Sequence, residues 1–393
     1  MHAVVIGPRI TPPWDSATAS LAKSRLMLFT HPRVVRFLDD VSLLTAFRDY
    51  RRVTHFHENA FGNEVYRKYF VWLRQLDAKA YFVEGCDPDV RPRLAQFMLN
   101  YALHSVVLPN AYRILWYIGY APSLPYLRRE RGKVFVENFT LDWRDAVLNH
   151  AYIRVATSTS IYHAIRKRRK PAVYLPPAID AGVFSPQSGT ITEWLKNGIE
   201  EADVRLLYMG PLIRDRFPIE IIIPMLLRLK NAGYKPVLVA LSTVRNRESL
   251  GYYRYINNLI RKHGLNNNLI LKLRVLVDDD EKVSAYNSFD VLLYMPLTGK
   301  LMADPPITVL EAMSCGLPPV TTSIGDIGYI VSKYSAGIAL SKPGPDILAK
   351  SIMEVINNKE FLSKKARRVI ETMYSVEAVA RLAEEIFTKI WGQ

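Results

Sequence analysis

The sequence predicts an α/β protein built from two Rossmann-like lobes that face a cleft. Its 393 residues are enough for two ordinary domains, each with a core of its own. Short β-rich apolar runs alternate with stretches of helical spacing, which is the pattern of parallel sheets covered by helices. The alternation is interrupted over residues 173–186 by a segment with three prolines and a glycine, and then restarts.

The first lobe is assigned to residues 1–180. A β-rich run at 2–7 ends in glycine, and a proline-rich loop then leads to a predicted helix over 18–28. Further strands are expected at 34–38, 80–84, 105–108, 133–136 and 152–157. Helical stretches separate most of them, so a parallel sheet is expected.

The second lobe is assigned to residues 181–375. Strands are predicted at 204–208, 236–240, 269–273, 291–294 and 319–322, with helices at 218–231 and 252–263. Residues 376–393 form a separate C-terminal helix, because apolar residues recur at helical spacing and no strand follows. Packing of this helix back onto the first lobe is one arrangement that the sequence allows.

Composition narrows the cellular setting. The two cysteines, Cys86 and Cys315, lie far apart and no charged-then-apolar leader opens the sequence, so we expect no disulfide framework and a cytoplasmic location. The sequence contains no run of about 18 uninterrupted apolar residues, so no membrane span is predicted. The net charge of +15 is concentrated in the first half and favours anionic partners.

The densest basic run covers residues 166–170 and follows an apolar segment. It is interpreted either as a solvated helix end, favoured by the helix dipole, or as a contact with an anionic membrane surface or acceptor. The second interpretation would place the protein peripherally on the inner face of a membrane. Nucleic acid is not an expected partner.

The stretch from residue 291 to residue 322 carries the clearest chemistry. It reads as strand, loop, helix and strand, with Pro305 or Pro306 at the helix start and Gly316 at its end. The helix start should face the C-terminal edge of a parallel sheet, where free N–H groups attract anions and ligands collect. Glu311 shares a helix face with Ile307 and Thr308. Its carboxylate can accept two hydroxyl hydrogen bonds, as a ribose diol would offer, or it is a solvated or salt-bridged helix residue.

Residues 306–320 resemble the nucleotide-sugar motif of the retaining GT-B glycosyltransferases known as group 1. Other segments of this chain are similar to that family in the same order, namely 155–160, 175–186, 207–217, 281–294 and 374–380. The resemblance covers about residues 150 to 393, whereas residues 1–150 match only in the pattern of elements. It implies a GT-B arrangement of the two lobes.

The resemblance also implies roles for particular residues. Glu311 would hold the ribose, and Arg216, which stands where the family has Lys, would bind the donor diphosphate with a planar fork of donors. The remaining expected donor-binding residues are Gly210, Arg214, Lys300, Pro306, Ile307 and Thr308. Glu311 must face the ligand, and the helix start must be open, for this assignment to hold.

Several positions depart from the family pattern. Ala303 stands where the motif has its first Glu, and either Asp304 or Lys300 is expected to contact the donor sugar instead. Pro211 replaces the family Arg of the phosphate loop, and Arg214 is a possible substitute for that Arg. Tyr329 occupies the place of a downstream family Glu.

The first lobe should supply the acceptor side. Where the family has a His at the end of a central strand, this chain offers Glu137 or Asn138, which join Arg216 and Asp304 as candidate catalytic residues. Trp14, Asp15 and Ser16 lie where the acceptor loop belongs. Trp14 either stacks on a sugar or closes the core.

No metal site and no cofactor are expected. His55, His57 and Glu58 have no partner at metal-ligand spacing, and the acidic run 278–281 resembles the first turn of a helix. We therefore predict a metal-independent, retaining hexosyl- or related glycosyltransferase. Its donor would be a nucleoside-diphosphate sugar, and its acceptor a glycan, a lipid-linked molecule or a small molecule. Two alternatives stay open: a polyanion- or membrane-binding protein on the same fold without transfer, and a sugar-nucleotide epimerase.

Overall fold

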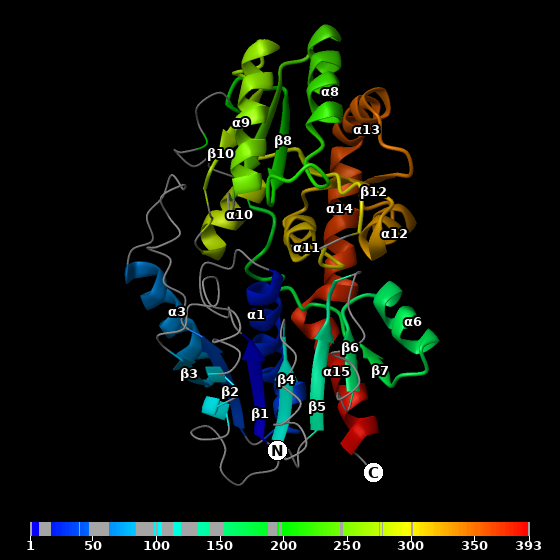
Figure 1. Cartoon of the computed structure of the whole chain (residues 1–393). Coiled ribbons are helices and arrows are strands. Elements are labelled where there is room, and N and C mark those ends of the chain that lie inside the picture. The colour runs from blue at the N-terminus through cyan, green and yellow to red at the C-terminus, as the bar shows by residue number, and fades with distance from the viewer. Residues whose placement is uncertain are drawn as a thin grey trace.

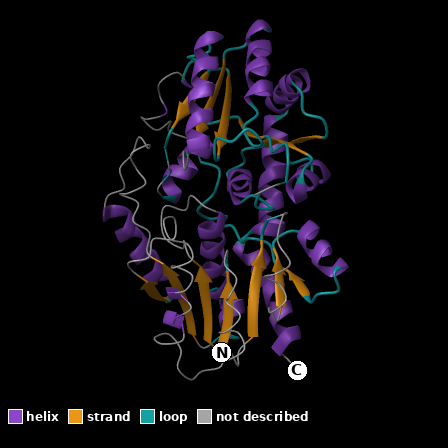
Figure 2. Cartoon of the chain, viewed as in Figure 1, coloured by secondary structure: helices purple, strands orange, loops and turns teal. Residues whose placement is uncertain are grey.

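A computed structural model of the chain has two lobes, each with its own parallel sheet (Figure 1). It describes residues 2–7, 17–38, 40–46, 63–83, 98–99, 101–103, 113–118, 133–140, 153–187, 195, 199–243, 247–274, 276, 278–299 and 302–391. Figure 2 shows the strands of each lobe at its centre with helices beside them. The predicted fold class is confirmed.

The N-terminal lobe holds a seven-stranded sheet in the order β3-β2-β1-β4-β5-β6-β7, and every strand pair is parallel. Its strands are β1 (His2–Gly7), β2 (Asp40–Ala46), β3 (Lys79–Val83), β4 (Arg113–Tyr117), β5 (Lys133–Asn138), β6 (Ile153–Ala156) and β7 (Ala172–Tyr174). Its helices are α1 (Ala17–Phe29), α2 (Pro32–Val35), α3 (Asn63–Gln75) and α6 (Thr159–Lys167). β6 is buried along its whole length, as expected where helices cover both faces of a parallel sheet.

The C-terminal lobe holds a six-stranded parallel sheet in the order β10-β9-β8-β11-β12-β13. Its strands are β8 (Val204–Met209), β9 (Pro236–Leu241), β10 (Leu269–Lys272), β11 (Val291–Tyr294), β12 (Pro319–Thr322) and β13 (Ile338–Leu340). Its helices are α8 (Ile219–Asn231), α9 (Arg247–Lys262), α10 (Asp279–Asn287), α11 (Ile307–Ser314), α12 (Gly325–Lys333), α13 (Pro345–Asn357) and α14 (Lys359–Val369).

Both sheets reverse their strand order at the first strand, between β1 and β4 and between β8 and β11. Ligands of open α/β sheets bind outside the carboxyl ends of the strands at such a switch point. The fold therefore places the candidate site at the ends of β8 and β11, where the C-terminal lobe meets the N-terminal lobe.

The chain crosses between the lobes twice, and the two crossings are joined. The backbone N–H of Ile179 donates to the carbonyl of Tyr374 at 2.7 Å, and Val376 N–H donates to the carbonyl of Ile179 at 3.0 Å. A π-helical turn (Ile370–Tyr374) then leads into α15 (Val376–Trp391).

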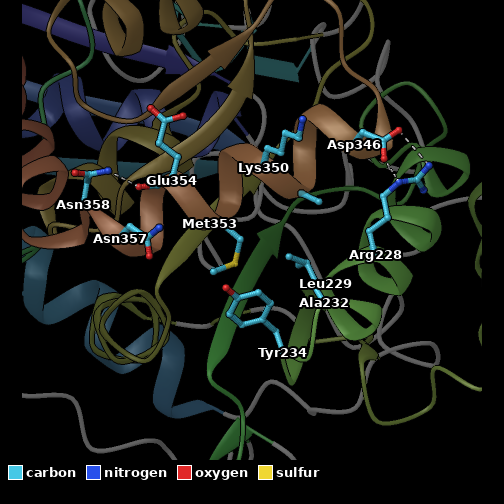
Figure 3. A pocket seen from close by; sticks show the side chains of 11 residues that line it. Arg228, Leu229, Ala232, Tyr234, Asp346, Lys350, Met353, Glu354, Asn357 and Asn358 are labelled. Carbon is cyan, nitrogen blue, oxygen red and sulfur yellow. Dashed lines mark hydrogen bonds and ion pairs between the residues drawn. The ribbon is translucent and has the colours of Figure 1, made fainter.

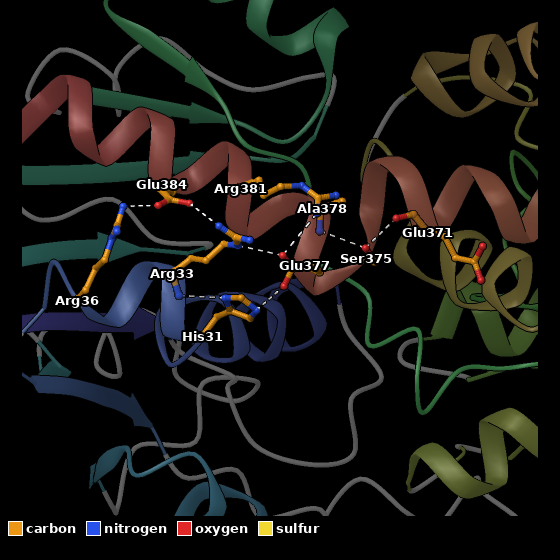
Figure 4. Close-up of polar contacts among 9 residues, drawn as sticks. All are labelled: His31, Arg33, Arg36, Glu371, Ser375, Glu377, Ala378, Arg381 and Glu384. Carbon is orange, nitrogen blue, oxygen red and sulfur yellow. Dashed lines mark hydrogen bonds and ion pairs between the residues drawn. The ribbon is translucent and has the colours of Figure 1, made fainter.

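The helix α15 packs on the N-terminal lobe, as the sequence allowed. Its buried residues Val379, Ala380, Ala383 and Phe387 belong to the core formed by α1 and the N-terminal sheet. Around α2, Arg33 bridges Glu377 at 2.9 Å and Glu384 at 3.2 Å (Figure 4). Apolar burial and surface ion pairs together fix this helix to the lobe from which the chain starts.

One predicted strand is wrong. Residues 34–38 form part of α2 and the turn that follows it, and the strand lies further on, as β2. His31 caps the start of α2 by accepting the N–H of Arg33, and Pro32 is preset for a first helical turn. The strand predicted at 105–108 lies outside the described residues. Among the described helices, none has the length and apolar character needed to span a bilayer.

Candidate functional site

The loop after β8 supplies the first part of the site. Gly210 directly follows this strand, and there its N–H donates to the Leu241 carbonyl and its own carbonyl accepts the Ser242 hydroxyl. Arg216 follows on a short turn and is half-buried. Burial raises the pKa of Tyr294, at the end of β11, to about 12, and the positive charge of Arg216 opposes this shift. Arg216 therefore lies at the switch point between β8 and β11.

Arg214, its neighbour in the loop, points elsewhere. Its guanidinium contacts Glu220 of α8 at 3.0 Å, and its side chain is 65% exposed. Of the two arginines, Arg216 is the one held inside the switch point.

The loop after β11 is tied to the loop after β8. Leu297 N–H donates to the Asp215 carbonyl at 2.7 Å, and the Thr298 hydroxyl donates to the Asp215 carboxylate at 3.1 Å. Lys300, an expected donor-binding residue, lies outside the described residues. The two loops thus form one edge beside Arg216.

The third part is α11, which begins where the sequence predicts. Pro306 is the cap residue and provides no side-chain cap, so the N–H groups at the helix start depend on other partners. Gly316 lies just past the helix end with φ +75°, a conformation that favours glycine. Ile307 and Thr308 at the helix start are half-buried, and Ile307 contacts the cores of both lobes.

The segment before α11 is held against the N-terminal lobe. Asp304 N–H donates to the Phe139 carbonyl at 2.8 Å, the Thr157 hydroxyl donates to the Asp304 carbonyl at 2.6 Å, and Ala303 forms a bridge with Thr140. The position that carries the first motif Glu in the family is therefore a backbone contact between lobes in this chain.

The predicted role of Glu311 requires that its carboxylate face outward, and in the structure it does not. Its carboxylate turns toward α10, where it contacts the ammonium of Lys282 at 2.9 and 3.2 Å and accepts the phenol of Tyr286 at 2.9 Å. The side chains of Lys282 and Glu311 are only 8% and 7% exposed. The physical reason is charge: a buried ammonium must be paired, and Glu311 is its counter-charge.

Asp304, a candidate catalytic residue, is fully buried below the helix α12. One carboxylate oxygen accepts the N–H of Asp326 at 2.9 Å. Burial and then the charge of Asp326 raise the pKa of Asp304, the Ser158 hydroxyl opposes the shift, and the net pKa is about 6. The Asp304 side chain is enclosed at the lobe junction, where it contacts the start of α12 and is not exposed to a sugar.

Asp326 joins the two lobes directly. Its carboxylate accepts the N–H and hydroxyl of Thr159 at 2.5 and 2.7 Å, and it accepts the N–H of Ser160 at 3.0 Å and the Ser160 hydroxyl. These groups form the amino end of α6 in the N-terminal lobe. A carboxylate is stabilised there by the free N–H groups and by the helix dipole.

The two candidates at the end of β5 differ in their surroundings. Glu137 is buried with Arg25, and it accepts the indole N–H of Trp116 at 2.7 Å. Arg25 also donates to the carbonyls of Leu175 and Pro176, so this cluster ties the interlobe segment to the sheet. It is a structural pair inside the lobe.

Asn138, by contrast, lies at the strand end. Its side-chain amide donates to the Val136 carbonyl at 2.9 Å, and its backbone carbonyl accepts the N–H and hydroxyl of Thr157. Of the two candidates on β5, Asn138 is the one that lies next to the junction of the two lobes.

Several predictions fall outside the described residues: the acceptor-side residues Trp14, Asp15 and Ser16 and the disfavoured set His55, His57 and Glu58. Tyr329, in the place of a family Glu, is exposed on α12. The acidic run begins α10 as predicted, with Asp278 accepting the Glu281 N–H. Across the described part of the chain, no group of three potential metal ligands occurs.

Sequence reasoning missed Lys282, Tyr286 and Asp326. A charged residue on the same helix face as apolar ones is a signal of a buried pair, and Lys282 shares a face of α10 with Ala285 and Tyr286. Nothing in the local sequence indicates that Asp326 would cap a helix of the other lobe.

A separate groove of about 500 Å³ lies between α8 and α13 (Figure 3). It is lined by Tyr234, Lys350, Met353 and Glu354, and Arg228 bridges Asp346 at one end. Because α8 ends and β9 begins here, this groove lies at the amino edge of the sheet. It is therefore distinct from the switch-point site.

Comparisons with known proteins agree with this geometry. Residues 236–376 match the family model described as "Glycosyl transferases group 1". Sucrose-phosphate synthase from Thermosynechococcus elongatus has a TM-score of 0.73 at 12% identity, over 100% of this chain and 99% of that one. HepE from Anabaena, in complex with UDP and glucose, has a TM-score of 0.66 at 10% identity, over 98% and 99%. A glycosyltransferase from Rickettsia africae has a TM-score of 0.66 at 12% identity, over 99% and 98%. At these identities the likeness shows the fold, which is of the GT-B type. A search of curated protein sequences finds no match.

Proposed function

We propose that this chain transfers a sugar from a nucleoside-diphosphate sugar to an acceptor held by the N-terminal lobe. The observation that carries the proposal is the meeting of three segments at the switch point of the second sheet. These are the Arg216 loop, the loop after β11 that is tied to it through Asp215, and the amino end of α11, to which the loop after β11 leads. The family match over residues 236–376 and the GT-B fold support the same function.

The site favours stabilisation of a leaving diphosphate. Arg216 offers a fork of charged donors, and α11 adds N–H groups at the positive end of its dipole. Both act on the negative charge that develops when the bond between the anomeric carbon and the phosphate oxygen breaks. We propose a metal-independent reaction with retained configuration at a hexose or related sugar, as the resemblance implies.

The acceptor would enter from the N-terminal lobe. Asn138 is the polar group of β5 that lies at the junction, and Trp14, Asp15 and Ser16 remain the proposed acceptor loop. The acceptor class, whether glycan, lipid-linked or small molecule, is a matter for product analysis.

The test is isothermal titration with UDP, GDP and ADP. We expect at least one to bind, and we expect Arg216→Met to weaken that binding by about 10- to 100-fold, since a charged hydrogen bond to phosphate is lost. Arg214→Met is the matched control, because its side chain is turned to Glu220, and it should bind as the unmodified chain does. Absence of binding by all three nucleotides, or equal losses in the two variants, would reject the proposal.

A second candidate partner is an anionic membrane surface. α6 ends in Arg166 and Lys167, and Arg168 and Arg169 follow it, and all four are exposed. This end of α6 is the one away from Asp326 and the lobe junction. We propose that it contacts anionic lipid, with affinity that falls as salt rises. Sedimentation with phosphatidylserine vesicles tests this, and retention that is unchanged between low and high salt argues against it.

A further inference from the structure

We propose that nucleotide binding at the switch point is coupled to the uptake of a proton by Asp304, so that the site holds a diphosphate more tightly as the pH falls toward 6. This inference rests on the proposed function and concerns the regulation of the same site. Asp304 lies two residues before Pro306, the cap of α11, and the backbone keeps its Cα atom within about 11 Å of that of Ile307. Because its side chain is fully buried, Asp304 acts on the site through its charge and touches no part of the donor.

The carboxyl group of Asp304 is buried without a cation. One oxygen accepts the Asp326 N–H at 2.9 Å, while Oδ2 is buried and has no hydrogen-bond partner among the described residues. No described lysine, arginine or histidine forms an ion pair with it. Glu311, by contrast, is buried together with the ammonium of Lys282. A buried carboxyl group that lacks a counter-charge favours its neutral form, so Asp304 is the group at this junction that is prepared to take up a proton.

The titratable groups that face Asp304 come from four elements, namely Asp326 from α12, Tyr174 from β7, Tyr294 from β11 and Tyr374 from the π-helical turn. Burial raises the pKa of Tyr174 and that of Tyr294 to about 12, and it raises the pKa of Tyr374 well above its ordinary value, so these phenols are neutral near pH 7. Burial and then the charge of Asp326 raise the pKa of Asp304 to about 6. Donors at the amino end of α6 hold the Asp326 carboxylate in its charged form, so Asp304 is the member of this pair that takes up the proton.

Tyr294 shows that Asp304 lies within electrostatic reach of the phosphate loop. Its phenol follows the carboxyl end of β11, and the charges of both Arg216 and Asp304 act on it. A diphosphate bound by Arg216 and the amino end of α11 replaces a local positive charge by a net negative one. Like charges repel across such partly buried surroundings, so the bound diphosphate raises the pKa of Asp304. By linkage, the affinity for the diphosphate falls as the pH rises from about 6 to the higher pKa of the bound state, and changes little beyond it.

Isothermal titration measures the proton directly. Whichever of UDP, GDP or ADP binds the full chain is titrated at about pH 6.5 in PIPES and in imidazole, two buffers of different ionisation enthalpy, and the change in observed enthalpy gives the number of protons taken up. The terminal phosphate of the nucleotide titrates in the same range, so the deciding quantity is the difference between the unmodified chain and Asp304→Asn. The unmodified chain should take up about half a proton more per nucleotide than this variant. Equal uptake in the two proteins would overturn the inference.

Affinities and two further variants test the assigned pair. Between about pH 5.5 and pH 7.5, the affinity of the unmodified chain should fall about fivefold more than that of Asp304→Asn. Asp346→Asn is the matched control, because Asp346 is exposed beside Arg228 at the amino edge of the sheet, and it should keep the uptake of the unmodified chain. Asp326→Asn keeps an acceptor for α6 and removes the like charge, so the pKa of Asp304 falls and the uptake at about pH 6.5 should shrink. Unchanged uptake in Asp326→Asn, or a loss in Asp346→Asn as large as that in Asp304→Asn, would contradict the role of this pair.

The two levels of the proposal fail in different ways. If none of the three nucleotides binds, the proposed function is lost and this inference with it. If a nucleotide binds and Arg216→Met weakens it, but Asp304→Asn takes up as many protons as the unmodified chain, the proposed function stands and only the coupling to Asp304 is wrong.

Discussion

Replacing Asp304 by Asn should stabilise the protein at neutral pH. Asp304 is fully buried at the junction of the lobes, where one oxygen accepts the Asp326 N–H. An Asn oxygen can accept the same hydrogen bond without a charge. Gly325 lies so close that a Cβ atom on it would be 2.6 Å from the Asp304 oxygen, so the pocket is shaped to this side chain and suits an isosteric amide.

The size of the effect follows from the pKa. Burial, and then the charge of Asp326, raise the pKa of Asp304 from 3.8 to about 6 in the folded chain. The folded chain therefore holds the proton more tightly than the unfolded chain, and the free energy of unfolding falls as the pH rises through this window. The difference corresponds to about 3 kcal/mol once Asp304 is fully ionised, and about half of it has developed by pH 5.

Urea denaturation at a series of pH values from 4 to 8 measures the effect. The free energy of unfolding of Asp304→Asn minus that of the unmodified chain should be small at pH 4 and should grow to about 3 kcal/mol at pH 8. Carboxylates that do not interact with Asp304 cancel in this difference, because both proteins share them. A difference that does not change with pH, or a variant that is less stable at pH 8, would refute the assigned environment of Asp304.

Two further predictions concern stability. Arg25→Met leaves the buried Glu137 carboxylate without its counter-charge, so the free energy of unfolding should fall by about 3–5 kcal/mol in urea titrations, and a loss below about 1 kcal/mol would contradict the buried pair. Phe387→Ala removes a buried ring of α15 from the N-terminal core and should cost about 3–5 kcal/mol. Glu384→Ala on the same helix removes contacts to exposed arginines and should have little effect, so equal losses in the two variants would be the contrary result.

Much of the second lobe could be predicted because its elements are strongly patterned. The predicted strand at 291–294 matches β11, and the predicted helix at 218–231 matches α8. The first lobe was harder. A five-residue apolar run such as 34–38 fits one helical turn as well as a strand, and the cap from His31 with Pro32 after it decided between them.

The extent of α11 was predictable, but the orientation of its side chains was not. Pro306 and Gly316 bracket α11 as local turn chemistry requires. The direction of Glu311 depends instead on Lys282, which lies 29 residues earlier in the chain and on another helix. Side-chain partners across such distances are set by packing of the whole lobe, and the spacing of residues along one helix carries no information about them.

The contacts between the lobes differ in strength from one side of the junction to the other. On the crossing side, the backbone bonds of Ile179 to Tyr374 and Val376 are shielded by the buried residues around them. On the side of α10, the lobes meet through ion pairs. The Lys68 ammonium lies 2.6 Å from the Asp278 carboxylate, and the Lys68 side chain is 51% exposed. Exposed pairs of this kind contribute little and weaken in salt, whereas the buried crossings do not. Opening of the lobes should therefore break the ion pairs at α10 first and pivot on the paired crossings.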